Sequence, residues 1–232
     1  MGIFNRLFGS SKDTFIAPPR DVHNNVQPKH DTKAIPSNKG GHAFRFVNEE
    51  STPADAYGMK IVVLAIEVSS KQIEEMFGDN EAILKMNISE HTTVARAHII
   101  ALQIAVYYVL ADRLCSSNRI VMENVVKGIA HAMGIVFDGA TNGSDMAQFL
   151  HTQFQKYAAS LVAELNTPPS SDNPFDTGAT ADLVAEYIRK DCQKDLLTDN
   201  PVDELRFKLL AANTGIRLLL VLLSKKIVTY VG

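Results

Sequence analysis

The chain has 232 residues, 46% of them hydrophobic, and a formal net charge of −3. A chain of this length and composition can bury a substantial core, in one large domain or two small ones. The small net charge excludes the basic footprint of a nucleic-acid-binding protein, and the absence of tryptophan argues against a surface for stacking bases or sugars.

Residues 1–50 are predicted to form an N-terminal arm rather than a folded domain. Four prolines and several Asn, Ser and Gly pairs interrupt residues 10–43, a pattern typical of an irregular tether. The alternation in residues 44–47 predicts one short strand, or an extended segment lying on the body. The arm carries seven Lys and Arg against five Asp and Glu, so it is mildly basic beside a mildly acidic remainder.

The beginning of the arm, residues 2–9, is a short amphipathic segment. Its apolar residues fall on one face of about two helical turns, with Asn5 and Arg6 opposite. These residues, the predicted partner-binding residues, are Ile3, Phe4, Leu7 and Phe8. Two helical turns are too few to be stable alone in water. We therefore expect order in this segment only where its apolar face touches the body of the chain, a partner or a membrane surface.

Residues 51–232 are predicted to form a helical domain. The sequence of residues 52–55 combines a threonine cap, a proline and an early acid, which is a strong helix start. Ser69 and Gln72 have the spacing of a capping box, which predicts that a second, short helix begins there and ends at Gly78.

The longest apolar run with helical character, residues 92–115, is predicted to be a central helix. A narrow polar stripe of Arg96, Gln103 and Tyr107 interrupts side chains that are otherwise mostly Val, Ile, Leu and Ala. A helix that is apolar almost all round belongs in the middle of a bundle, where several neighbours cover it.

Apolar stripes at helical spacing predict further helices at 119–133, 144–165 and 180–193, and a last helix that begins at 200–201 and runs through Leu223. The polar, proline-rich residues 167–178 predict a flexible link. The predicted fold is therefore all-α: an irregular bundle of six or seven helices with a long, mostly irregular N-terminal arm.

The sequence contains no Walker A motif, Gly-x-Gly-x-x-Gly, Gly-x-Ser-x-Gly or His-Glu-x-x-His. His98 is predicted to face the interior, about 160° around the helix from Arg96. A pairing of His98 with His131 or Glu123 would form a buried polar site for an enzyme or a metal. The simpler interpretation is one buried histidine that is hydrogen-bonded to a carbonyl or an acid. We predict no cofactor and no catalytic or metal-ligating residue.

Two cysteines, Cys115 and Cys192, lie far apart without the spacing of a metal site, and each is predicted to be a core residue. The closest candidate for a membrane span, residues 216–223, has eight residues and includes Arg217, short of the roughly 18 consecutive apolar residues of a membrane span. Residues 1–9 are too short and too interrupted for a secretory leader. These features predict a cytoplasmic protein.

The function predicted from these features is protein binding without catalysis, as an adaptor, a chaperone-like protein or an accessory subunit of a larger assembly. Two observations support this prediction: the sequence shows no complete catalytic set, and it carries an apolar segment on a long tether. A tether raises the effective concentration of such a segment at a partner. Docking is expected to take place partly through residues 2–9.

Two alternatives stay open. One is an enzyme or metal-binding protein with a polar site near His98, His131 and Glu123. The other is a peripheral membrane protein anchored by residues 2–9. Membrane contact is expected to be weak, because Arg6 and Lys12 alone supply positive charge and a weak anchor needs a second signal. The sequence leaves the oligomeric state open.

Overall fold

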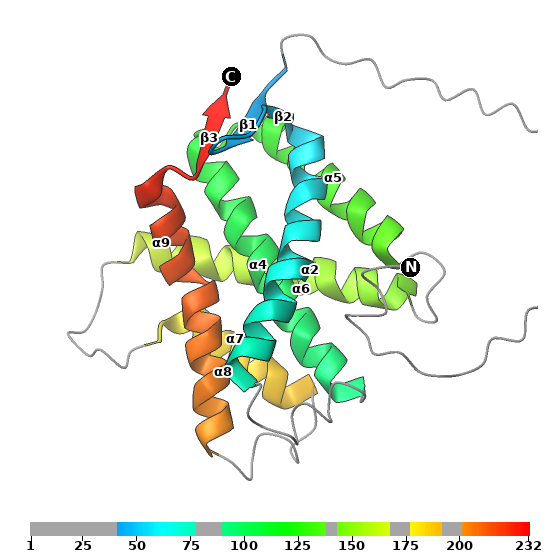
Figure 1. Ribbon diagram of the computed structural model, residues 1–232, viewed down its shortest axis with the longest axis vertical. Coiled ribbons are helices and arrows are strands. Elements are labelled where there is room, and N and C mark those ends of the chain that lie inside the picture. The colour runs from blue at the N-terminus through cyan, green and yellow to red at the C-terminus, as the bar shows by residue number, and fades with distance from the viewer. Residues whose placement is uncertain (1–40, 78–89, 138–142, 168–176, 192–200) are drawn as a thin grey trace, which may run out of the picture.

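The computed structural model describes residues 41–77, 90–137, 143–167, 177–191 and 201–232. Within these residues it contains seven helices and one small sheet, which confirms the predicted all-α irregular bundle (Figure 1). The predicted partner-binding residues in segment 2–9, most of the tether, most of the predicted link at 167–178 and Cys192 lie outside the described residues.

The helices follow one another along the chain from the small sheet at residues 43–53 to the last strand. Their bounds are α2 (Ala54–Phe77), α4 (Glu90–Leu114), α5 (Arg119–Phe137), α6 (Gly143–Asn166), α7 (Ala179–Asp191), α8 (Pro201–Thr214) and α9 (Ile216–Lys225).

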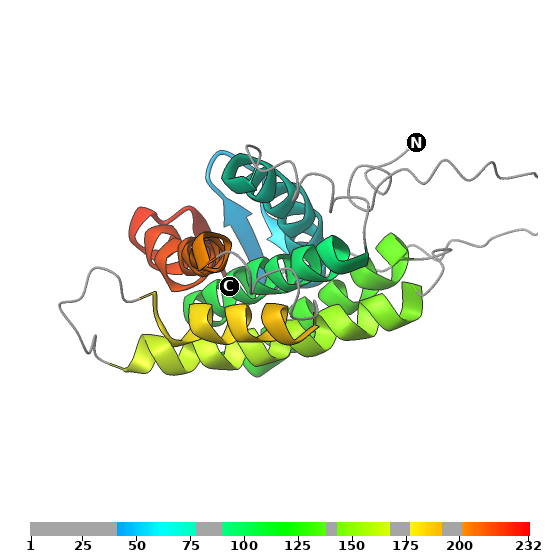
Figure 2. The ribbon, with the colours of Figure 1, turned by 90° about the horizontal axis from the view of Figure 1, so that it is seen from below.

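The central position predicted for residues 92–115 is confirmed by α4. It lies between α2 and the α8–α9 pair on one side and α6 and α7 on the other (Figure 2). Its side chains from Ala95 to Ala111 are nearly all buried, and the polar stripe is buried with them: Gln103 is fully enclosed, and Arg96 and Tyr107 are less than a tenth exposed. The stripe is therefore part of the packing interface, not a solvated strip.

A small antiparallel sheet closes one end of the bundle. β1 (Ala43–Phe46) lies in the middle, paired with β2 (Thr52–Pro53) and with β3 (Val228–Val231). β1 confirms the predicted strand at residues 44–47, and its Phe44 and Phe46 point into the core. β3 was not predicted, because four residues after a long helix give too short an alternation to recognise.

Two predicted helix boundaries are wrong. The suspected capping box at Ser69 and Gln72 lies within α2, which continues unbroken to Phe77; both residues face neighbouring helices rather than capping a new one. The predicted last helix is divided at Gly215, which separates α8 from α9. The packing at Gly215 is tight, because an added Cβ would lie 3.0 Å from the carbonyl oxygen of Ala211 and the backbone would have to shift by a few tenths of an ångström.

Candidate functional site

A buried polar network surrounds His98, on the side of α4 that faces α6 and α7. The Nδ1 atom of His98 lies 2.7 Å from the hydroxyl of Tyr157, and its Nε2 atom lies 2.9 Å from a carboxylate oxygen of Asp191. His98 and Tyr157 are fully enclosed, whereas the Asp191 side chain is 28% exposed. The network therefore runs from the protein interior to the surface at the end of α7.

The partners of His98 determine its protonation state. An ionised carboxylate can only accept a hydrogen bond, so Nε2 carries the proton that is donated to Asp191. In the neutral ring Nδ1 is then an acceptor, and the Tyr157 hydroxyl donates to it. Burial lowers the pKa of His98 from 6.5 to about 4, although the Asp191 carboxylate opposes this shift. The geometry and the pKa shift both favour a neutral imidazole.

Aromatic rings enclose the same histidine. The ring of Tyr187 stacks on the imidazole at a centroid distance of 6.2 Å and an interplanar angle of 13°, and Phe149 meets it edge-on at 5.1 Å. Lys156 lies over the outer ring of this group, with its Nζ atom 4.7 Å from the centroid of Tyr187. Because these rings surround a fully buried imidazole, we assign the network a structural role instead of a catalytic one.

The predicted grouping of His98 with His131 or Glu123 is wrong. His131 and Glu123 lie on exposed positions of α5, and the Glu123 carboxylate instead accepts from Arg119 one turn earlier, at 2.9 Å. The simpler interpretation, a single buried histidine bonded to an acid, is confirmed by Asp191. Among the described residues, no group of three His, Cys, Asp or Glu side chains is arranged to hold a metal ion.

Removing the hydroxyl of Tyr157 tests the network. In Tyr157→Phe, the Nδ1 atom of His98 stays buried without its donor, so we expect the free energy of unfolding to fall by about 2 kcal/mol. Tyr187→Phe is the matched control, because the Tyr187 hydroxyl makes no hydrogen bond to another described residue; its effect should stay within about 0.5 kcal/mol. Urea unfolding followed by circular dichroism measures both. Equal losses in the two variants would contradict the assigned hydrogen bond.

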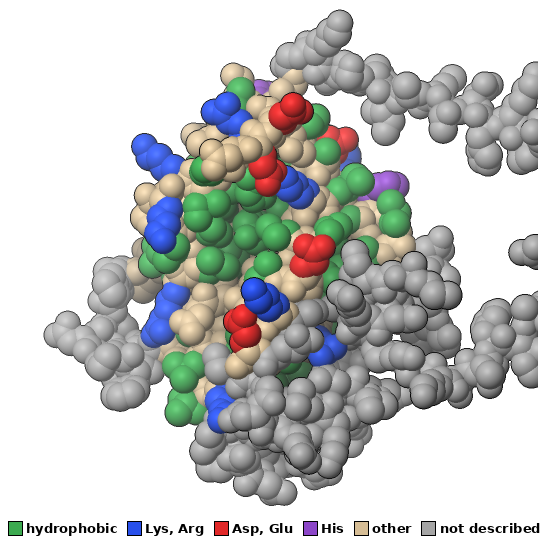
Figure 3. All heavy atoms as spheres, viewed as in Figure 1, with side chains coloured by type: hydrophobic (Ala, Val, Ile, Leu, Met, Phe, Trp, Pro, Cys, Tyr) green, Lys and Arg blue, Asp and Glu red, His purple; other side chains and the backbone are tan. Residues whose placement is uncertain are grey.

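A second feature is an apolar surface between α2 and α9. Both helices pack on α4 but scarcely touch one another. Figure 3 shows hydrophobic side chains gathered between them. We define the α2–α9 face as Leu64 of α2, Leu218 and Val221 of α9, and Phe46 at the end closed by the sheet. Leu64 and Leu218 are partly buried against the core, and Val221 is 41% exposed.

The helical geometry places these residues on the flank of α9 nearer to α2. α9 runs toward the sheet with α4 behind it and α2 beside it (Figure 1), and in a right-handed helix this puts Leu218 and Val221, three residues apart, on the α2 side. Leu220 projects about 160° from Leu218 at 100° per residue, onto the opposite flank. It is 52% exposed and provides a natural comparison.

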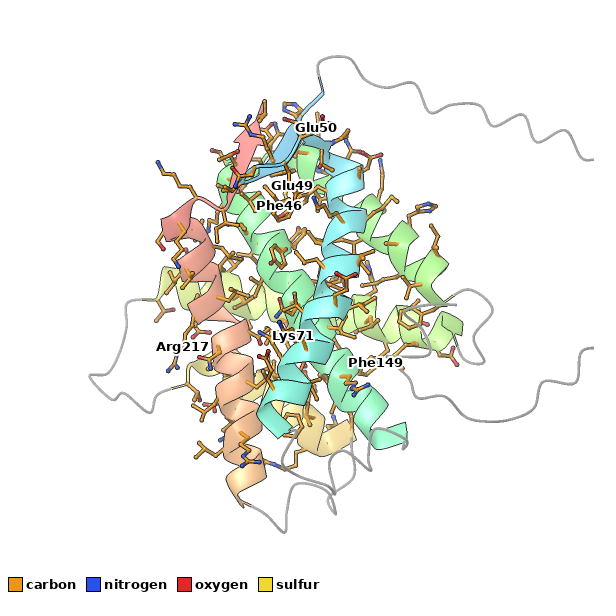
Figure 4. The ribbon with its side chains drawn as sticks, in the orientation of Figure 1. Phe46, Glu49, Glu50, Lys71, Phe149 and Arg217 are labelled. Carbon is orange, nitrogen blue, oxygen red and sulfur yellow. The ribbon has the colours of Figure 1, made fainter. Side chains whose placement is uncertain are left out.

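Polar contacts mark the two ends of the α2–α9 face. At the sheet end, Lys60 of α2 pairs with Glu49 and lies 4.6 Å above the ring of Phe46, which Figure 4 places between α2 and α9. At the other end α2 meets α8: the side-chain oxygen of Gln72 accepts from Gln103 at 2.9 Å and from Thr214 at 3.3 Å. The apolar surface therefore lies between two polar bridges: the Lys60–Glu49 ion pair at the sheet end and the hydrogen bonds of Gln72 at the other end.

The α2–α9 face was only partly predictable from the sequence. Its apolar residues were assigned to helices, but Leu205 and Leu220 of the predicted last stripe are more than half exposed. The break at Gly215 changes the direction of the stripe, so a stripe read as one continuous helix does not identify the buried face of α9. α2 and α9 are also far apart in the chain, so no local sequence pattern indicates that they contribute to one surface.

Among the described residues, mean hydropathy identifies three helical stretches that are long and apolar enough to cross a membrane by length and composition: Ala95–Leu114, Arg119–Phe137 and Leu205–Lys225, the last of which includes parts of α8 and α9. A search for unbroken apolar runs misses these stretches. A single polar residue such as Gln103 interrupts a run, but it hardly changes the mean hydropathy of an 18-residue window. The first stretch is 78% buried inside the protein, so its apolar character is explained by the core; the other two are 44% and 39% buried. Cytoplasmic localisation stays a prediction.

Comparison of the chain with family models, with curated proteins and with solved structures finds no match.

Proposed function

We propose that this protein is a non-enzymatic helical binding protein, an adaptor, chaperone-like protein or accessory subunit of a larger assembly, whose α2–α9 face receives the apolar side of a partner's amphipathic helix. The observation that carries the proposal is the exposed apolar flank of α9 beside α2, above all Val221 at 41% exposure next to the half-buried Leu218. A contiguous apolar surface with a charged margin is typical of a protein interaction site.

The geometry supports a helix as the ligand. α2 and α9 both lie on α4 and scarcely contact each other, so apolar side chains are exposed between them, and the side-chain ridges of another helix can pack on such a surface. Helix-in-groove recognition uses apolar anchors at positions i, i+3, i+4 and i+7 of the ligand. Lys60 and Lys71 on the α2 side of the face can pair with acids on the polar side of such a helix (Figure 4).

Residues 2–9 enter the proposal as a second contact. Residues 10–42 connect them to the described body at β1, whose opposite end, Phe46, belongs to the α2–α9 face. A partner held on the face would meet this segment at a high effective concentration.

Charge placed on the α2–α9 face tests the function. We expect Val221→Glu to lower recovery of the protein partner by about tenfold, because a carboxylate would be buried in an apolar interface, and its pairing with Arg217 or Lys225 one turn away offsets only part of that cost. Affinity isolation of the full chain from native cells, quantified by mass spectrometry, measures this recovery. Leu220→Glu adds the same charge to the opposite flank of α9 and should retain the partner.

Thermal melting of both variants checks that each is folded, since both changes fall at exposed positions. If Val221→Glu and Leu220→Glu recover the same proteins in the same amounts, the α2–α9 face is not the binding surface, and the proposed function fails.

A further inference from the structure

We infer that residues 2–9 of the same chain cover the α2–α9 face when no partner is bound. The inference deepens the proposed function and rests on it for the binding role of this face. It identifies the occupant in the free protein and implies that a partner helix must displace the segment, which then becomes available as a second contact.

The connection of the chain favours this occupant. The tether of residues 10–42 enters the body at β1, and Phe46, the last residue of β1, forms one end of the α2–α9 face. For comparison, a random coil of 33 residues spans about 30 Å root-mean-square. α2, with 24 residues, is about 36 Å long at 1.5 Å per residue. The segment therefore reaches every part of the face without extending the tether.

The chemistry of the segment matches the surface. Ile3, Phe4, Leu7 and Phe8 form one apolar face of two turns, a length of about 12 Å that fits between the two polar bridges. Such a short helix needs an apolar surface in order to be stable. The α2–α9 face supplies one, and it is the surface on which α9 presents Val221 to solvent.

One acidic side chain beside the face, Glu67, is complementary to the basic segment. Residues 1–12 contain Arg6 and Lys12 and no acid. On α2, Glu67 follows Leu64 by three residues, so the two side chains are neighbours on the helix surface. Glu67 is exposed and forms no ion pair with another described residue. Arg6, on the polar side of a docked segment, has a carboxylate within its reach there.

Docking within the chain is favoured over docking onto a second copy. A tether of this length holds its end near the face at an effective concentration in the millimolar range, well above the concentration of other copies in a dilute sample. Exchange between two copies would make the same contacts but would add the entropy cost of association.

Site-directed photo-cross-linking on the full chain tests the inference. Phe8 is replaced by p-benzoylphenylalanine, the purified protein is irradiated at low micromolar concentration, and cross-linked peptides are mapped by mass spectrometry. We expect cross-links within one chain, to α9 around Leu218 and Val221 or to α2 around Leu64. Irradiating a mixture of isotopically light and heavy chains distinguishes links within one chain from links between two.

Two variants on opposite flanks of α9 test whether the cross-links depend on the α2–α9 face. Val221→Glu is expected to lower the yield of these cross-links by about tenfold, and Leu220→Glu to leave it unchanged. Links to another part of the body, links only between light and heavy chains, or no link at all would each overturn the inference. The proposed function is judged separately: if Val221→Glu still loses the partner while no link forms within the chain, the face binds a partner but residues 2–9 do not cover it.

Discussion

Replacing Gly128 by alanine is expected to lower the free energy of unfolding by about 3 kcal/mol, because α2 and α5 must then move apart. A Cβ at Gly128 would lie 1.9 Å from the carbonyl oxygen of Asp55 on α2, and one at Gly58 would lie 2.1 Å from the carbonyl oxygen of Val125 on α5. Both clashes are with backbone, so no change of side-chain rotamer relieves them.

Gly134 on the same helix is the matched control. An added Cβ there meets nothing within 4 Å, and the position is exposed. Gly134→Ala is therefore expected to stabilise the protein by about 0.5–1 kcal/mol, since alanine is the better helix former. Urea unfolding of both variants, followed by circular dichroism, makes the comparison. Similar effects at Gly128 and Gly134 would show that the close approach of α2 and α5 does not limit stability.

The extent of α5 was only partly predicted from the sequence. The helix over residues 119–133 was predicted from its apolar stripe, and five of the six stripe residues are buried in α5, with Val126 half-buried. Its end was placed at Gly134, whereas α5 continues to Phe137. A glycine is a frequent helix terminator, but its penalty inside a helix is only about 1 kcal/mol, which packing of Phe137 can offset.

Tertiary contacts decided what local patterns did not. The buried position of His98 followed from the periodicity of the central helix, but its partners lie 59 and 93 residues further along the chain, beyond any spacing rule. Glu123 and His131 were chosen as partners for their chemistry alone, without knowing which faces of α5 pack. The α2–α9 face likewise combines helices from opposite ends of the domain.

Acidification is expected to destabilise the protein through His98. The pKa of this group is about 4 in the folded protein and 6.5 in the unfolded chain, so between these values the unfolded chain binds the proton and the folded protein does not. The contribution of His98 to the free energy of unfolding is therefore fully present above about pH 6.5. It decreases as the pH falls and is lost by about pH 4. The difference between the two pKa values corresponds to about 3 kcal/mol.

The measurement is urea unfolding at pH values between 7.5 and 4, for the wild-type chain and for His98→Gln. Carboxylates elsewhere titrate in both proteins, so the contribution of His98 is the difference between the two curves. We expect the advantage of the wild-type chain over His98→Gln to shrink steadily from about pH 6.5 to about pH 4, because glutamine has no proton to gain. A difference that stays constant over this range would mean that the folded protein accepts the proton as readily as the unfolded chain, as an ion pair between a protonated His98 and Asp191 would allow. In that case the Tyr157 hydroxyl would accept from Nδ1 instead of donating to it.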